Sequence, residues 1–155
     1  MAGIHVVGIQ GPRLGGGRFG GVRRSTGADV VAKLLIVDDD EISARFFGEV
    51  LTNLGHRVVA VSNAPDAIEL AAGEPPDLIL MDLEMPGMNG IDATREIKGN
   101  AALSHIPVAI LSAHSEAQAF DEVRLSGADD YIHKQSDRAT LQRKVDGILS
   151  KFPPG

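Results

Sequence analysis

Three apolar runs that each end in a polar residue constrain this chain more than any other feature. The runs span residues 34–37, 78–81 and 108–111, and they lead into Asp38, Asp82 and Ser112. A shorter strand candidate, residues 131–133, leads into Lys134. Uninterrupted apolar runs are typical of parallel strands that are buried on both faces. The carboxyl ends of such strands meet at one edge of the sheet, where open α/β sheets bind ligands, so we expect these polar groups to share one small space.

Helical patterns alternate with the strands. The first helix is predicted from apolar residues at helical spacing, and Gly55 ends it. Those apolar residues are Ile42, Phe46, Phe47, Val50, Leu51 and Leu54. Residues 57–61 are predicted to form a second strand, and a short helix after Asn63 has Ile68 and Ala71 on its inner face. Further helices are expected within 90–98, over 115–126 and from Asp137, the last with an apolar face. Its members are Leu141, Val145, Ile148, Leu149 and Phe152. The pattern is (βα)5 and predicts an α/β fold with a parallel sheet covered on both faces.

Composition divides the chain into three parts. Residues 1–32 hold half of the 18 glycines and are predicted to be a flexible Gly/Arg-rich tail. Gly8, Gly11 and the glycines at 15–17 loosely resemble a dinucleotide-binding loop, but no helix pattern follows them. Residues 33–152 are expected to form one domain, with 153–155 as the C-terminal end.

Charge and composition also narrow the class of protein. The net charge is −6 although residues 1–32 carry four arginines and one acidic residue, so the domain is acidic and direct DNA binding is not expected. Cysteine is absent, and no apolar run approaches the ~20 residues of a membrane span. We expect a cytoplasmic protein with no membrane association.

The predicted sheet edge has the chemistry of a site for a cation and a phosphoryl group. Two carboxylates about 4 Å apart repel by roughly 4 kcal/mol at an effective dielectric of 20. Asp38, Asp39 and Asp82 therefore need a proton or a cation, and oxygen ligands without His or Cys favour Mg²⁺. The simpler interpretation, that acidic residues at strand ends only cap helices, suits Asp40 but does not explain why several strands converge on complementary groups.

In their order and spacing, four segments resemble the receiver domains of two-component response regulators. They are residues 37–39 (Val-Asp-Asp), 81–90 (Met-Asp-Leu-Glu-Met-Pro-Gly-Met-Asn-Gly), 111–113 (Leu-Ser-Ala) and Lys134. The resemblance covers about four-fifths of the chain. It implies a doubly wound, flavodoxin-like parallel sheet of five strands in the order 2-1-3-4-5.

The resemblance also implies roles for individual residues. Asp82 would be the phosphoacceptor, and Ser112 and Lys134 would contact phosphoryl oxygens. Asp38, Asp39, Asp82 and the backbone carbonyl of Glu84 would hold Mg²⁺. Tyr131 matches an aromatic position that moves inward on activation, with a half-buried strand tyrosine as the alternative. His114 and Glu84 match positions that tune the lifetime of the acyl phosphate.

The implied function is that of a stand-alone response regulator. A sensor histidine kinase or a histidine phosphotransfer protein would supply the phosphoryl group. An unknown output protein would bind the face formed by the fourth helix, the fifth strand and the last helix. The chain would not be an enzyme beyond catalysing its own phosphorylation and dephosphorylation.

The sequence departs from the family pattern at one position, and it leaves two alternative functions open. Receivers usually follow the lysine with a cis-proline, but Gln135 stands here, and a cis bond before a non-proline residue costs ~2.5–4 kcal/mol. A phosphatase of the haloacid-dehalogenase type would use Asp38 and Asp40 as nucleophile and acid/base, with Ser112, a lysine and Asp129-Asp130. A receiver-like module that binds partners without phosphorylation is the other alternative.

Overall fold

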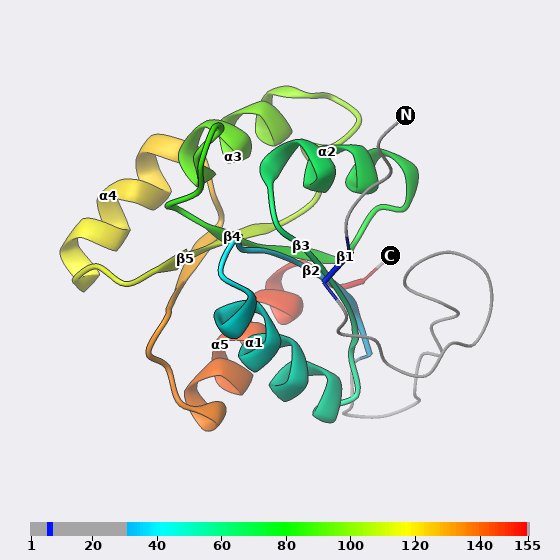
Figure 1. Ribbon diagram of the computed structural model, residues 1–155, viewed down its shortest axis with the longest axis vertical. Helices are drawn as coiled ribbons and strands as arrows, with labels where there is room; N and C mark the ends of the chain where they lie inside the picture. The colour runs from blue at the N-terminus through cyan, green and yellow to red at the C-terminus, as the bar shows by residue number, and fades with distance from the viewer. Residues whose placement is uncertain (1–5, 8–30, 155) are drawn as a thin grey trace.

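The computed structural model describes residues 6–7 and 31–154, and from residue 33 onward strands and helices alternate (Figure 1). In chain order the elements are β1 (Val6–Val7), β2 (Lys33–Val37), α1 (Glu41–Asn53), β3 (Arg57–Val61), α2 (Ala64–Gly73), β4 (Leu78–Asp82), α3 (Gly90–Gly99), β5 (Val108–Ser112), α4 (Glu116–Ser126), β6 (Asp130–His133) and α5 (Arg138–Lys151). The succession from β2 to α5 confirms the (βα)5 prediction. None of the helices in the described ranges is long and apolar enough to cross a membrane.

The sheet has the strand order β1-β3-β2-β4-β5-β6. Strands β2 to β6 are parallel and confirm the predicted order, with β2 at the centre of the reversal between β3 and β4. Strand β1 adds an antiparallel edge strand, in which Val6 lies opposite Val61 and Val7 opposite Ala60. Val6 and Val7 lie within residues 1–32, for which the flexible tail stays a prediction. The prediction for 1–5 and 8–30 lies outside the described residues.

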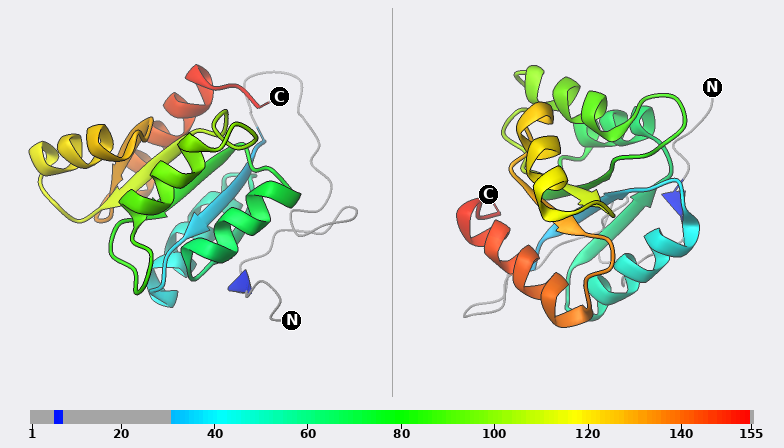
Figure 2. Two further views of the ribbon diagram at one scale, coloured as in Figure 1. Left: turned by 90° about the horizontal axis from the view of Figure 1, so that it is seen from above. Right: turned by 90° about the vertical axis from the view of Figure 1, so that its left-hand side faces the viewer.

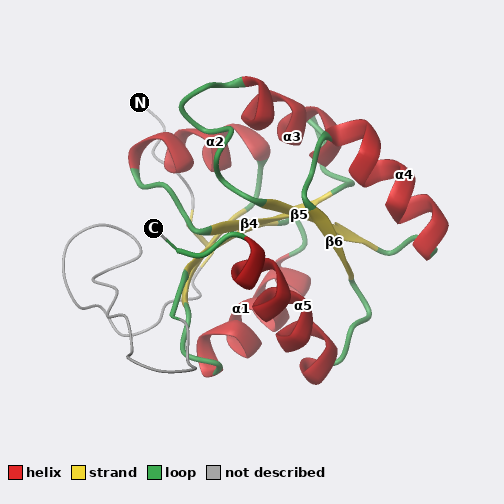
Figure 3. Ribbon diagram, turned by 180° about the vertical axis from the view of Figure 1, so that it is seen from behind, coloured by secondary structure: helices red, strands yellow, loops and turns green. Residues whose placement is uncertain are grey.

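Helices cover both faces of the sheet. Helices α1 and α5 pack on one face, and α2, α3 and α4 lie on the other (Figure 3). The right-hand view of Figure 2 shows the same two helical layers with the strands between them. Along β2, Leu34 and Ile36 join the core under α1 and α5, whereas Leu35 and Val37 join the core on the opposite face. Both faces of the strand are therefore buried, which is why its apolar run is uninterrupted.

Polar side chains immediately before the helices set where each helix begins. Each accepts a hydrogen bond from a backbone N–H in the first turn, which satisfies a donor that the helix itself cannot pair. The caps are Asp40, Asn63, Asn89, Ser115 and Asp137. Asp40 thus has the capping role that the sequence suggested for it.

The apolar stripe predicted for the first helix is wider than the face that the fold buries. Phe47, Val50 and Leu51 are in the core, but Ile42 is 82% exposed and Phe46 is 46% exposed. The two exposed residues lie one turn apart on the same side of α1. Phe152, predicted on the inner face of the last helix, is instead the half-exposed residue that follows α5.

Gly90 has a structural role that explains its position at the start of α3. Its N–H donates to the carbonyl of Leu83 at 2.9 Å, which folds the segment after β4 back on the strand. A Cβ at this position would collide with the backbone carbonyl of Asp82 and would lie 2.9 Å from the Cα of Leu83. Only glycine lets the helix start this close to the strand end.

We expect Gly90→Ala to destabilise the fold by about 3 kcal/mol, because the backbone on both sides of the collision must move. Gly147→Ala is the matched control, since a Cβ there meets nothing within 4 Å and alanine favours the α5 helix by about 0.5–1 kcal/mol. Urea unfolding of both variants checks this. Equal stabilities would contradict the packing role of Gly90.

Candidate functional site

The carboxyl ends of β2, β4 and β6 bring three ionisable side chains to one edge of the sheet. Asp38 follows β2, Asp82 ends β4, and Lys134 follows β6. Val37 is paired with Met81, so Asp38 and Asp82 leave neighbouring strands side by side at the point where the strand order reverses. A cavity of about 150 Å³ at this edge is lined by Asp39, Asp40, Asp82, Leu83, Glu84, Leu111, Ala113, His114 and Lys134.

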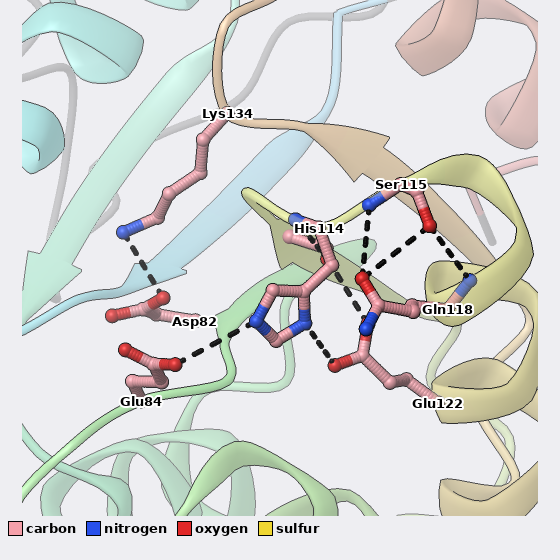
Figure 4. Close-up of polar contacts among 8 residues, drawn as sticks. Asp82, Glu84, His114, Ser115, Gln118, Glu122 and Lys134 are labelled. Carbon is pink, nitrogen blue, oxygen red and sulfur yellow. Dashed lines mark hydrogen bonds and ion pairs between the residues drawn. The ribbon is translucent and has the colours of Figure 1, made fainter.

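An ion pair with Lys134 partly neutralises the buried carboxylates. Lys134 Nζ lies 3.0 Å from Asp82 Oδ1 and 3.3 Å from Asp38 Oδ2 (Figure 4 shows the contact with Asp82). Burial and the adjacent charge of Asp38 raise the pKa of Asp82 to about 7, although Lys134 opposes this. Burial alone would lower the pKa of Lys134, but the two carboxylates outweigh it and raise that pKa, so the ammonium stays charged.

The acidic cluster has the properties of a site for a hard cation. Oxygen atoms of Asp38, Asp39 and Asp82 lie within 4.8 Å of one another. Asp38 is fully buried, and its Oδ2 makes no hydrogen bond even though Lys134 is close. A buried carboxylate oxygen is costly unless a cation pairs with it, and here a single ammonium is shared between Asp38 and Asp82. The set is oxygen only, and an oxygen-only set suits Mg²⁺.

Ser112 ends β5 at the same edge, but its hydroxyl is directed toward α4. Its Oγ donates to Glu122 Oε1 at 3.0 Å and accepts the N–H of His114 at 3.1 Å. The other oxygen of Glu122 is 2.7 Å from His114 Nδ1, and His114 Nε2 is 3.7 Å from Glu84 (Figure 4). Ser112 is therefore in the predicted place, with its single donor already engaged.

Sequence reasoning did not find Glu122. In the sequence it is one of several charged residues on an amphipathic helix, and such residues are usually solvated. In the structure its side chain is only 14% exposed and it contacts both Ser112 and His114. No pattern signals this contact, because it depends on how α4 packs beside the end of β5.

Lys134 reaches the carboxylates without the cis-proline that usually follows it. The described residues contain no cis peptide bond, so the bond between Lys134 and Gln135 is trans. The backbone N–H of Lys134 donates to the carbonyl of Ser112 at 2.8 Å and continues the pairing of β5 with β6. Because the pairing of β5 with β6 fixes Lys134 before the loop begins, Lys134 contacts Asp38 and Asp82 even though Gln135 follows it.

Tyr131 is half-buried on β6, between α4 and α5. Lys144 Nζ lies 4.5 Å from the centre of its ring, in the position of a cation–π contact. Burial and the neighbouring carboxylate of Glu116 raise the pKa of the phenol. Its proposed movement on activation stays a prediction.

A family model provides the decisive comparison. Residues 34–146, most of the chain, match the response regulator receiver domain. The chain belongs to this receiver family. The family assignment agrees with the flavodoxin-like sheet and with the position of the acidic cluster at its edge.

Relatives of this receiver include regulators from several bacteria. Protein PilH of Pseudomonas aeruginosa is 38% identical over 122 residues, which cover 77% of this chain and 99% of that protein. The polar-differentiation response regulator DivK of Brucella anthropi is 32% identical over 101 residues, or 65% of this chain and 82% of DivK. Among solved structures, the receiver domain of a histidine kinase from Syntrophus aciditrophicus superposes with a TM-score of 0.73 at 30% identity, covering 81% of this chain and 95% of that domain.

The raised pKa of Asp82 leads to a prediction about stability and pH. A carboxyl whose pKa is higher in the folded than in the unfolded protein favours folding below pH 4, and this contribution is lost as the pH rises through 7. Without divalent cations, Asp82→Asn should therefore become more stable relative to the parent between pH 5 and 7.5, by about 2 kcal/mol. Mg²⁺ should reduce the difference at pH 7.5.

Urea unfolding of parent and variant at each pH, in chelator and in Mg²⁺, measures this difference. Asp121→Asn is the control, because that carboxylate is 64% exposed on α4 and does not belong to the acidic cluster. A difference in stability between Asp82→Asn and the parent that stays constant from pH 5 to 7.5 would contradict the raised pKa of Asp82.

Proposed function

We propose that this receiver accepts a phosphoryl group on Asp82, in a Mg²⁺-dependent reaction, and signals by a conformational change that alters partner binding. One observation carries the proposal: Asp82 lines the cavity at the sheet edge, with an ammonium 3.0 Å from one oxygen and two further carboxylates beside it. A nucleophile, a fixed positive charge and a cation site thus share one small space. Phosphoryl transfer needs these three parts.

The contacts of the two buried aspartates favour Asp82 over Asp38 as the nucleophile. Asp38 Oδ1 accepts the N–H of Asp40 at 3.0 Å, and Asp38 does not line the cavity. In the proposed step an oxygen of Asp82 attacks the phosphorus of a phosphohistidine, the P–N bond breaks, and the leaving imidazole takes up a proton. Lys134 then pairs with a phosphoryl oxygen and offsets its charge.

Asp38, Asp39 and Asp82, with the backbone carbonyl of Glu84, would hold Mg²⁺. When bound, the cation neutralises negative charge that builds up on the phosphoryl oxygens during transfer. The protein's own contribution is to keep three carboxylates close together despite their repulsion. The same cluster would be needless in a module that only binds partners, which favours phosphorylation over that alternative.

The phosphatase alternative loses support from the role of Asp40. That reaction needs Asp40 as a mobile acid/base, but its side chain accepts the N–H of Ile42 at 3.0 Å and caps α1. A residue committed to a helix cap is poorly placed to carry protons. We propose that the chain has no catalytic role beyond its own phosphorylation and dephosphorylation.

The proposed partners follow from the family. A sensor histidine kinase or a phosphotransfer protein would supply the phosphoryl group in the cytoplasm. The output protein would bind the face formed by α4, β6 and α5, where Phe120 and Leu125 of α4 are 64% and 56% exposed. Exposed apolar side chains of this size suit a protein contact.

We expect a small phosphodonor such as acetyl phosphate to label only Asp82, and only with Mg²⁺. Chemical trapping of the acyl phosphate followed by peptide mapping identifies the residue. Asp82→Asn should abolish labelling, whereas Asp40→Asn should keep it, because asparagine also caps helices well. Label on Asp38, or equal labelling in excess chelator, would overturn the proposal.

His114 and Glu84 are expected to set the lifetime of the phosphorylated state. Both line the cavity, and their side chains meet 3.7 Å apart. We propose that they flank the path of a water that attacks phosphorus opposite Asp82. The decay of labelled protein should change more than twofold in His114→Ala or Glu84→Ala relative to the parent. If both half-lives stay within twofold, a barrier change of only ~0.4 kcal/mol, this role is wrong.

A further inference from the structure

We infer that Glu122 is a positioning residue that competes with the phosphoryl group for the hydroxyl of Ser112, and thereby couples phosphorylation to α4. The inference rests on the proposed function, because the competing hydrogen-bond acceptor is a phosphoryl oxygen on Asp82. It assigns a role to a residue of α4 that does not touch the reacting atoms.

A serine hydroxyl has a single proton to donate. In this structure Ser112 Oγ donates it to Glu122 Oε1 at 3.0 Å, and the same oxygen accepts the N–H of His114. To donate to a phosphoryl oxygen on Asp82, the hydroxyl must first give up Glu122. The two hydrogen bonds therefore exclude each other. The free energy gained from the bond to the phosphoryl group is reduced by the free energy lost with the bond to Glu122.

Burial makes the contact with Glu122 strong enough to matter. Ser112 is 1% exposed, and the side chain of Glu122 is 14% exposed. A hydrogen bond to a charged group in such surroundings contributes more than one between neutral groups. After the hydroxyl leaves, Glu122 keeps only His114 Nδ1, at 2.7 Å, among the partners that the structure shows.

The contact also joins the site to α4. About one turn further along the helix, Arg95 Nε of α3 donates to the carbonyl of Leu125 at 2.9 Å. Glu122 thus joins α4 to Ser112 and His114 beside the site, whereas Arg95 joins α4 to its neighbouring helix. Breaking the Ser112–Glu122 bond removes the direct contact between α4 and the end of β5, and it leaves the contacts of Glu122 with His114 and of Leu125 with Arg95 in place.

Binding of beryllofluoride with Mg²⁺, measured by calorimetry, tests the competition, because this ion mimics the phosphoryl group on an aspartate. Glu122→Ala should bind it roughly tenfold more tightly than the parent, the ratio for one hydrogen bond to a charged group. In a Ser112→Ala background the same substitution should change affinity less than twofold. The control Asp121→Ala removes a neighbouring charge of α4 and should also stay within twofold.

Glu122→Gln separates hydrogen bonding from charge. It removes the negative charge but keeps an oxygen that accepts from Ser112, so it should bind beryllofluoride less tightly than Glu122→Ala. Equal tightening by both variants, or tightening that persists without the Ser112 hydroxyl, would mean that Glu122 acts only through its charge and would overturn the inference. No tightening in Glu122→Ala would overturn it as well.

The same titrations distinguish this inference from the proposed function. If the parent protein does not bind beryllofluoride, or if Asp82→Asn binds it equally well, the assignment of Asp82 fails and the role of Glu122 fails with it. If the parent binds and Asp82→Asn does not, the proposed function stands. The Ser112–Glu122 cycle then decides the inference alone.

Discussion

The charge balance between Asp82, Asp38 and Lys134 is the interaction on which the rest of the site depends. Two carboxylates on neighbouring parallel strands are forced together by the pairing of β2 with β4, and one ammonium from β6 lies against both. The ammonium does not offset burial and the charge of Asp38, which together raise the pKa of Asp82 to about 7. The remaining imbalance favours a cation at the cluster, and a phosphoryl group can then be accepted beside it.

The second constraint is the limited hydrogen-bonding capacity at the end of β5. Ser112 cannot serve Glu122 and a phosphoryl group with the same proton. Phosphorylation of Asp82 on β4 can thus alter the contacts of α4, a helix whose side chains do not line the cavity. Such a mechanism needs no large movement of the sheet, because only one hydrogen bond is exchanged and the helix has a second attachment through Arg95.

Close backbone packing supports both features. The segment after β4 must fold back tightly for Glu84 to line the cavity, and the absence of a side chain at Gly90 makes that possible. Lys134 depends on the backbone in a similar way, since its N–H is held by the carbonyl of Ser112. The bond before Gln135 is trans, and Lys134 nevertheless lies 3.0 Å from Asp82.

The sequence by itself determined the (βα)5 order, the parallel sheet and the polar residues at its edge, because uninterrupted apolar runs and helix caps are local patterns. The face of α1 predicted from the sequence is wider than the buried one, because Ile42 and Phe46 are exposed. Periodicity shows which residues share a face of a helix, but it does not show whether another element covers them. The sequence shows no sign that Val6 and Val7 pair with β3, because two residues are too short a pattern. Only the tertiary structure decided that Glu122 holds the hydroxyl of Ser112, because that contact joins a helix and a strand whose packing no local pattern encodes.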